Sequence, residues 1–224
     1  MRRTYNYLPV LALLLFCIPF ASGQSGVDIN VGLGSAHASA NGGGIDSAGS
    51  VTNAFGTCTP SSGDTFCQKL PTLSGVFLGF GGDIMFRKQF GIGAEANIQP
   101  TRSDYGPLQY RETFYDVNGI YEPISQKKFA LQLQGGIGAA RTGFSFNQSA
   151  CVGSVVCTSQ TQPVGSASHF QVHVGAGVQI YLTEHIFVRP QFDLHYVPGF
   201  NQQFGSNVVP EGTIWVGYNI GHNQ

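Results

Sequence analysis

The sequence carries little charge. Only 10% of its 224 residues are Asp, Glu, Lys or Arg, whereas about a quarter is usual in a soluble domain. Eleven Lys and Arg stand against twelve Asp and Glu, and Arg2 and Arg3 lie at the extreme N-terminus. A chain this mildly acidic offers no basic surface, so we expect no nucleic-acid partner.

Apolar runs long enough for a membrane-spanning helix are also missing. The run at 8–20 is interrupted by Pro9 and Pro19, and a spanning helix needs about 20 apolar residues. Basic residues before this run and small residues after it are typical of a secretory signal peptide. We therefore expect residues 1–23 to be removed and residues 24–224 to form one exported domain, which must use strands to enter a membrane.

Cysteine is scarce. Cys17 lies in the signal, and the other four form two close pairs, Cys58 with Cys67 and Cys151 with Cys157, each inside a long polar segment. An exported protein meets an oxidising periplasm, so we predict a disulfide within each pair, although four cysteines formally allow three connectivities. Each would stabilise its loop by roughly 2 to 3 kcal/mol. The alternative is a metal site, but no His flanks either pair at ligand spacing, and we expect neither metal nor cofactor.

Glycine is abundant, with 31 residues, and it takes part in a two-residue rhythm. Eight segments alternate large apolar residues with Gly, Asn, Gln, Asp or His, and turn residues separate them. A period of two is that of a strand with two unlike faces. The segments are 27–38, 76–86, 90–98, 109–122, 129–139, 169–182, 186–196 and 213–220.

The connections between these segments are alternately long and short. The short ones are 87–89, 123–127 and 183–185. Outer-membrane barrels have an even number of strands, short periplasmic turns and longer extracellular loops. We therefore predict an all-β fold, an eight-stranded antiparallel up-and-down transmembrane β-barrel in the bacterial outer membrane, because a closed barrel leaves no edge unpaired in lipid.

The period alone does not say which face points outward, and a soluble barrel of the lipocalin type would hold its apolar face inside. The apolar face here carries too many bulky side chains for an eight-stranded interior, while the other face is rich in Gly and small polar residues. We expect the apolar face to contact lipid. Four tyrosines on that face are expected in aromatic girdles at the membrane interfaces, with strand propensity as the alternative reason for them: Tyr115, Tyr121, Tyr196 and Tyr218.

The polar face carries five acids and one Arg, Arg189. Because Arg binds carboxylates in bidentate fashion, we predict a hydrogen-bonded network centred on Arg189 that fills the lumen. The alternative is a narrow path that prefers cations, since acids without a counter-charge attract them. The acids are Asp28, Asp83, Glu95, Asp116 and Asp193.

His173 and His195 also fall on the inward face, near the long connections. His169 lies four residues from His173 on one strand, about 13 Å away, which is too far for both to bind one metal ion. With a Ser or Asp partner these histidines could serve a lipid-modifying hydrolase, but its catalytic groups would have to reach lipid. We expect hydrogen-bonded lumen histidines instead.

The last segment contains Ile214-Trp215-Val216-Gly217-Tyr218. With the export signal, eight strands and alternating connections, the chain resembles the small outer-membrane barrels of the OmpA/OmpX type. That resemblance implies that the barrel-insertion machinery reads an aromatic residue ending the last strand. Here the strand continues to Ile220, so either Tyr218 serves this role or the recognition differs.

These features favour an integral outer-membrane barrel with a structural or adhesion-like role. Exposed loops on a rigid scaffold are where recognition usually resides. The loops at 39–72 and 143–167, each braced by its disulfide, are the predicted site for a surface ligand, and we expect no enzymatic activity. The alternatives are a narrow conduit for small solutes or cations and a lipid-modifying hydrolase.

Overall fold

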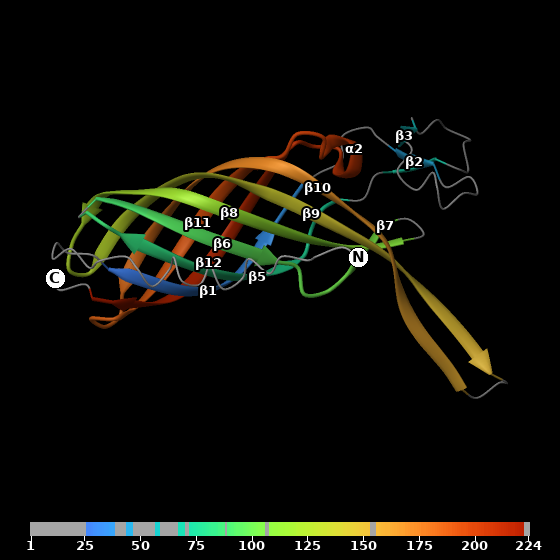
Figure 1. Cartoon of the computed structure of the whole chain (residues 1–224), viewed down its shortest axis with the longest axis horizontal. Coiled ribbons are helices and arrows are strands. Elements are labelled where there is room, and N and C mark those ends of the chain that lie inside the picture. The colour runs from blue at the N-terminus through green and yellow to red at the C-terminus, as the bar shows by residue number, and fades with distance from the viewer. Residues whose placement is uncertain are drawn as a thin grey trace, which may run out of the picture.

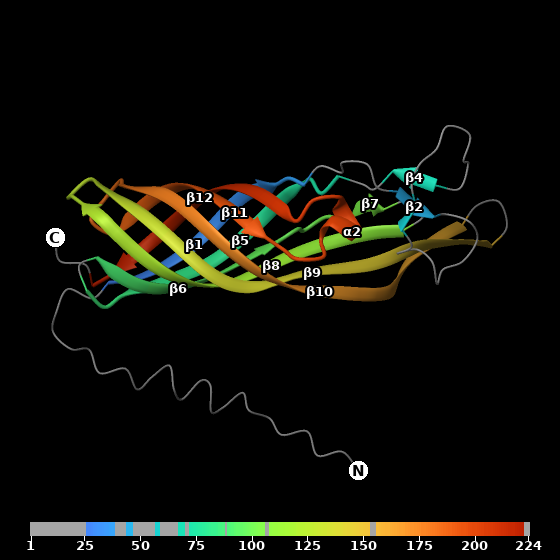
Figure 2. The same cartoon turned by 90° about the horizontal axis from the view of Figure 1, so that it is seen from above.

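The computed structural model describes residues 26–38, 44–46, 57–58, 67–69, 72–87, 89–105, 108–152 and 156–221. Within them, eight long antiparallel strands form a closed ring (Figures 1 and 2). The predicted eight-stranded up-and-down barrel is confirmed. The strands are β1 (Val27–Ala36), β5 (Val76–Met85), β6 (Phe90–Ile98), β8 (Leu108–Ser125), β9 (Phe129–Val152), β10 (Val156–Tyr181), β11 (Ile186–Tyr196) and β12 (Val208–Ile220).

The ring closes between its first and last strands. Val27 of β1 lies opposite Ile220 of β12, and the pairing continues to Ala36 opposite Glu211. Every other strand of the ring pairs with its neighbour along the chain. Each of the eight strands therefore has two hydrogen-bonded neighbours, so the ring presents no open edge.

The two faces of the barrel differ as the alternation predicts. On β1, Ile29 and Val31 are 57% and 54% exposed, whereas Asp28 and Asn30 are 5% and 1% exposed. The same contrast follows the other strands, with Val, Ile, Leu and Phe outside and polar or small residues inside. The apolar face points outward, as expected. In the described ranges, no helix is both long and apolar enough to cross a membrane.

Short turns join the strands at one end of the barrel. They close on backbone hydrogen bonds such as those from the amides of Phe86, Gln126 and Leu182 to the carbonyls of Phe90, Phe129 and Ile186. The long connections gather at the opposite end (Figures 1 and 2). The predicted turn at 123–127 is displaced slightly, because β8 continues to Ser125.

The segment 143–167 is not the polar loop that the sequence predicts. Strands β9 and β10 continue through it as a paired hairpin, whose residues 153–155 lie outside the described residues. The pairing of β9 with β8 ends at Ser145, and the pairing of β10 with β11 begins only at Val172. In the outer hairpin, which is the part of β9 and β10 beyond Ser145, the two strands therefore pair only with each other (Figure 1). Backbone hydrogen bonds between strands require no particular side chain, so a segment rich in Ser, Thr, Asn and Gln can pair as strands without an alternating apolar pattern.

Smaller elements surround the same end. Within 39–72, β2 (Gly44–Asp46), β3 (Thr57–Cys58) and β4 (Cys67–Lys69) form a three-stranded sheet with β2 in the middle. Strand β7 (Ser103–Tyr105) pairs with the start of β8. In the last long connection, the short helix α2 (Asn201–Phe204) ends at Gly205, whose φ of 74° is the left-handed conformation that glycine adopts without strain.

An apolar cluster fills the barrel at the end of the long connections. Phe200 and Phe204, from the connection between β11 and β12, are both 0% exposed, and the ring of Phe204 lies 5.0 Å from that of Tyr110. No pattern in the sequence indicates this cluster, because Phe200 and Phe204 lie among Gly, Asn and Gln without periodicity. We call it the apolar cap: Ala36, Ala38, Leu73, Phe77, Leu108, Tyr110, Phe114, Ala140, Phe144, Val197, Phe200, Phe204 and Val209.

Candidate functional site in the barrel lumen

The lumen beyond the apolar cap is packed with polar side chains. In the described part of the chain, eight buried acids share the interior with one buried Arg and two buried His, His173 and His195. Glu112, Glu122 and Glu211 are not among the predicted lumen acids, although their odd or even positions along the strands indicate the inward face. The acids are Asp28, Asp83, Glu95, Glu112, Asp116, Glu122, Asp193 and Glu211.

Arg189 lies at the centre of the first cluster and is 0% exposed. Its Nη1 donates to Asp83 Oδ2 at 2.7 Å and also to Gln132, and its Nη2 donates to Glu95 Oε1 at 3.1 Å. The guanidinium carbon lies 5.7 Å from the centre of the buried Trp215 ring. Cation, carboxylates and indole therefore pack together inside the barrel.

Glutamines extend this cluster from Glu95 to Asp193. Gln134 Nε2 donates to Glu95 Oε2 at 3.3 Å and to Asp193 Oδ1 at 3.0 Å. Gln191 Nε2 donates to the same two carboxylates, at 3.2 and 2.8 Å. Neutral amides thus separate two acids that would otherwise repel each other.

Other predicted lumen acids do not contact Arg189. Asp28 accepts hydrogen bonds from Gln179 Nε2, at 3.2 Å, and from Asn219. The structure therefore holds several local clusters rather than one network around Arg189. The alternation along each strand indicates that these glutamines face inward, but it does not say which acid each of them contacts.

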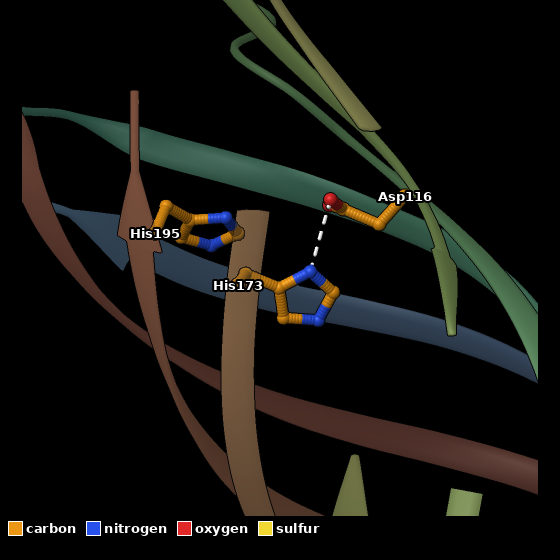
Figure 3. Close-up of side chains that lie close together, drawn as sticks. All are labelled: Asp116, His173 and His195. Carbon is orange, nitrogen blue, oxygen red and sulfur yellow. Dashed lines mark hydrogen bonds and ion pairs between the residues drawn. The ribbon is translucent and has the colours of Figure 1, made fainter. Parts of the chain in front are cut away.

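The second cluster brings together three residues that the sequence analysis considered separately (Figure 3). His173 lies directly opposite His195 in the register of β10 and β11, and the two ring centres are 5.1 Å apart. Asp116 reaches them from β8, with its Oδ1 3.0 Å from His173 Nδ1. It can do so because Gly138 on the intervening strand β9 has no side chain, and a Cβ there would lie 2.7 Å from Asp116 Oδ1.

Further hydrogen bonds fix these three side chains. Gln171 Nε2 donates to Asp116 Oδ1 at 2.6 Å, and His195 Nε2 lies 3.0 Å from Glu211 Oε2. The His195 ring stacks on Phe114 of the apolar cap, with centres 5.0 Å apart and planes at 21°. The cluster therefore lies directly against the cap.

The arrangement does not resemble a hydrolase centre. His173 Nε2 has no hydrogen-bond partner among the described residues, whereas a nucleophile and its base stand within hydrogen-bond reach of each other. Both histidines are buried inside the barrel, at 4% and 1% exposure. They do not face the lipid that such an enzyme would modify.

The four tyrosines predicted at the membrane interfaces all lie on the outer face, 39% to 50% exposed. Tyr121 stacks on Phe90 at 5.1 Å near the short turns, and Tyr196 ends β11 at the opposite end. Tyr115 and Tyr218 share that outer face, and the role of Tyr218 in insertion stays a prediction.

The predicted disulfides and signal peptide concern residues that the structure describes in part or not at all. Cys151 lies directly opposite Cys157 in the register of β9 and β10. Cys58 and Cys67 lie on β3 and β4, which flank β2. The side chains of all four cysteines, and residues 1–25, lie outside the described residues, so these predictions stand untested.

Comparison with known proteins agrees with this architecture. The family model described as "Outer membrane protein beta-barrel domain" matches residues 8–206. Among curated proteins no match is found. The chain is similar to the crystal structure of Ail from Yersinia pestis in complex with the heparin analogue sucrose octasulfate, at 12% identity and a TM-score of 0.52, covering 88% of this chain and 99% of Ail.

Two further solved structures are similar at lower scores. The outer membrane protein OprG from Pseudomonas aeruginosa matches at 16% identity and a TM-score of 0.47, covering 88% of this chain and 98% of OprG. Neisserial surface protein A matches at 10% identity and a TM-score of 0.46, covering 89% of this chain and 97% of that protein. The chain belongs to the family of outer membrane protein β-barrel domains and is an integral protein of the bacterial outer membrane.

Proposed function

We propose that this barrel is a closed scaffold that presents the hairpin of β9 and β10 at the bacterial surface to bind an uncharged, hydrogen-bonding ligand. The observation that carries the proposal is the length of the hairpin. Beyond Ser145 it loses β8 and continues to Val152, about seven residues or roughly 23 Å of strand. A ribbon that projects from a rigid barrel is free to contact a partner.

The composition of the hairpin indicates the chemistry of that partner. The segment 143–167 contains no Asp, Glu, Lys or Arg, and 11 of its 25 residues are Ser, Thr, Asn or Gln. Hydroxyls and amides suit adaptable hydrogen bonding, as in antibody paratopes. Without charges, the hairpin provides no electrostatic steering, so binding should depend little on salt.

A cavity of about 260 Å³ lies where the base of the hairpin meets the connection that carries α2. Its lining combines small residues, which leave room, with hydroxyl, amide and imidazole groups that form hydrogen bonds. A small uncharged group with several hydroxyls, such as one sugar ring of a neutral glycan, suits this lining. The lining residues are Gly165, Ser166, Ala167, His169, Gly199, Gln202 and Gln203.

The ligand in the Ail structure, a heparin analogue, is a polyanion. In this chain Lys69 is the single Lys or Arg in 39–72 and 143–167 taken together. Polyanions are held by clusters of Lys and Arg. The composition of these segments therefore favours a neutral glycan over a sulfated one.

A cation conduit is the second candidate, because eight buried acids face one buried Arg in the described lumen. Two features argue against it. Arg189 and its partners Asp83, Glu95 and Gln132 fill the middle of the barrel, and the side chains of the apolar cap, apart from the Tyr110 hydroxyl, present only carbon atoms to a hydrated ion at one end. Eight-stranded barrels are only just wide enough for their own side chains.

The test uses intact cells that display either the natural chain or a variant with a shortened hairpin. In the variant, Asn-Gly replaces residues 147–161, because this dipeptide forms a tight two-residue turn. The probe is a panel of neutral oligosaccharides on beads, with heparin beads for comparison. We expect the natural chain to retain at least one neutral probe, equally well from about 50 to 500 mM salt.

The shortened variant should lose this binding, while a control variant that lacks residues 47–56 should keep it. Binding to heparin alone, or binding that survives shortening of the hairpin, would contradict the proposal. The closed state is tested separately by single-channel recording in planar bilayers, where a steady current through the natural chain would favour the conduit instead.

A further inference from the structure

Three side chains that offer metal-binding atoms meet directly against the apolar cap. One ligand atom each from Asp116, His173 and His195 lies within 4.8 Å of the other two (Figure 3). Asp116 Oδ1 and His173 Nδ1 are already 3.0 Å apart. Around a tetrahedral ion with bonds of 2.0 to 2.1 Å, ligand atoms are about 3.3 Å apart. To bind such an ion, the longest distance between two of these ligand atoms would have to shorten by at most about 1.5 Å.

The strands hold these atoms in place without the help of loops. His173 and His195 lie on adjacent, directly paired positions of β10 and β11, and Asp116 crosses the bare backbone of Gly138 to reach them. Groups on paired strands of a closed barrel have little freedom to separate. A site on such elements is held more precisely than one on loops.

The surroundings of His195 are those of a metal-binding imidazole. Its Nε2 lies 3.0 Å from Glu211 Oε2, and Glu211 is itself held by the hydroxyl of Thr213 at 3.1 Å. A carboxylate that accepts the proton on one ring nitrogen leaves the lone pair of the other nitrogen available to a metal. That other atom, His195 Nδ1, is buried and has no hydrogen-bond partner in the described part of the chain.

Asp116 is also held by a neighbour, because Gln171 Nε2 donates to its Oδ1 at 2.6 Å, and a second lone pair of that oxygen is left for a metal ion. The acids Asp193 and Glu211, buried on the neighbouring strands β11 and β12, favour a positive ion in the same region. Two imidazoles with one carboxylate suit divalent ions of the zinc class, whereas Ca²⁺ and Mg²⁺ require oxygen ligands throughout.

We propose that Asp116, His173 and His195 form a binding site for one divalent transition-metal ion such as Zn²⁺, with Glu211 as the residue that orients His195. Water would complete the coordination. The apolar cap covers the cluster, so the ion enters while the barrel folds rather than afterwards. The site is independent of the hairpin and of its proposed ligand.

The experiment folds the tag-free mature chain into lipid vesicles in the presence of Zn²⁺, removes loose ions with a chelator, and counts the retained zinc by mass spectrometry. Folding with Co²⁺ gives a second readout, since cobalt bound by nitrogen and oxygen ligands absorbs visible light. We expect one ion per natural barrel. The variants His173→Gln and His195→Gln should retain less than a tenth of that amount.

Glu211→Gln tests the orienting role and should weaken zinc binding by about 10- to 100-fold without abolishing the cobalt spectrum. His185→Ala is the matched control, because His185 is exposed at the short-turn end of the barrel. Folding of every variant is checked by its heat-dependent mobility in gels. Natural barrels that retain no zinc, or folded His173→Gln and His195→Gln variants that retain as much as His185→Ala, would overturn the proposal and leave the histidines as hydrogen-bonded lumen residues.

Discussion

Replacement of Arg189 by Met leaves two buried carboxylates without their cation. In the natural chain Arg189 forms ion pairs of 2.7 and 3.1 Å with Asp83 and Glu95, and all three side chains are at most 5% exposed. Met keeps an apolar stem of similar length, so much of the packing over Trp215 is retained. The variant therefore tests the lost charge more than the lost volume.

Removal of one partner from a buried ion pair costs about 3 to 5 kcal/mol, because the charge left behind is poorly solvated. We expect the free energy of unfolding to fall by that amount in Arg189→Met. A triple variant that also carries Asp83→Asn and Glu95→Gln has no charge left behind. It should recover more than half of the loss, since neutral groups of the same shape are tolerated far better.

The assay is reversible urea unfolding in lipid vesicles, followed by circular dichroism of the strands. Tryptophan fluorescence is unsuitable, because Trp215 lies 5.7 Å from the altered group. Equal urea dependence in all variants would show that the unfolding reaction is unchanged. A loss below about 1 kcal/mol in Arg189→Met, or a triple variant no more stable than the single one, would refute this account of the lumen.

The other predictions concern the packing of the lumen, the cap and the hairpin. Gly175→Ala places a methyl group against the Asp193 carboxylate, and we expect a loss of about 1 to 3 kcal/mol in the same urea assay. Phe204→Ala removes a fully buried ring from the apolar cap, which should cost about 3 to 5 kcal/mol in the same urea assay. Exported protein should contain a Cys151–Cys157 disulfide in peptide mapping, and its reduction should speed proteolysis of the hairpin tip.

Both substitutions have a matched control. Gly212→Ala should change stability little, because nothing lies within 4 Å of the added methyl group. Phe192→Ala removes a ring that is 57% exposed on the outer face, so it should cost less stability than Phe204→Ala. Equal stability of both glycine variants, a loss in Phe204→Ala no larger than that in Phe192→Ala, or free thiols at both hairpin cysteines would contradict the respective reasoning.

The positions of the strands, and which side chains of a strand face the lumen, could be predicted because both depend on residues that are close in sequence. Alternation along a single strand decides which side chains face inward, so the buried Asp83, Glu95 and Arg189 could be named in advance. The same rule failed for the outer hairpin, because Ser, Thr, Asn and Gln occur at both odd and even positions of 143–167 and give no alternating signal. It also failed for Phe200 and Phe204, whose burial depends on a loop folding back over the barrel.

Partners across strands were harder to predict than positions along them. His173 could be compared with His169 on the same strand, but its proximity to His195 depends on the register between β10 and β11. Contact with Asp116 further depends on a glycine in the strand between them. Such distances are set by backbone pairing over the whole barrel, and no local pattern encodes them.

The seam between β1 and β12 has a consequence for the timing of assembly. Asp28, near the start of β1, bonds to Asn219, near the end of β12, a separation of 191 residues. A chain that is exported from its N-terminus delivers β1 first, yet the last strand must arrive before that edge is paired. Contacts between such distant residues form slowly. The chain thus most needs a chaperone during the time in which the edge of β1 is unpaired. Mutations that weaken the pairing of β1 with β12 should slow assembly more than mutations that weaken another strand pair by the same amount.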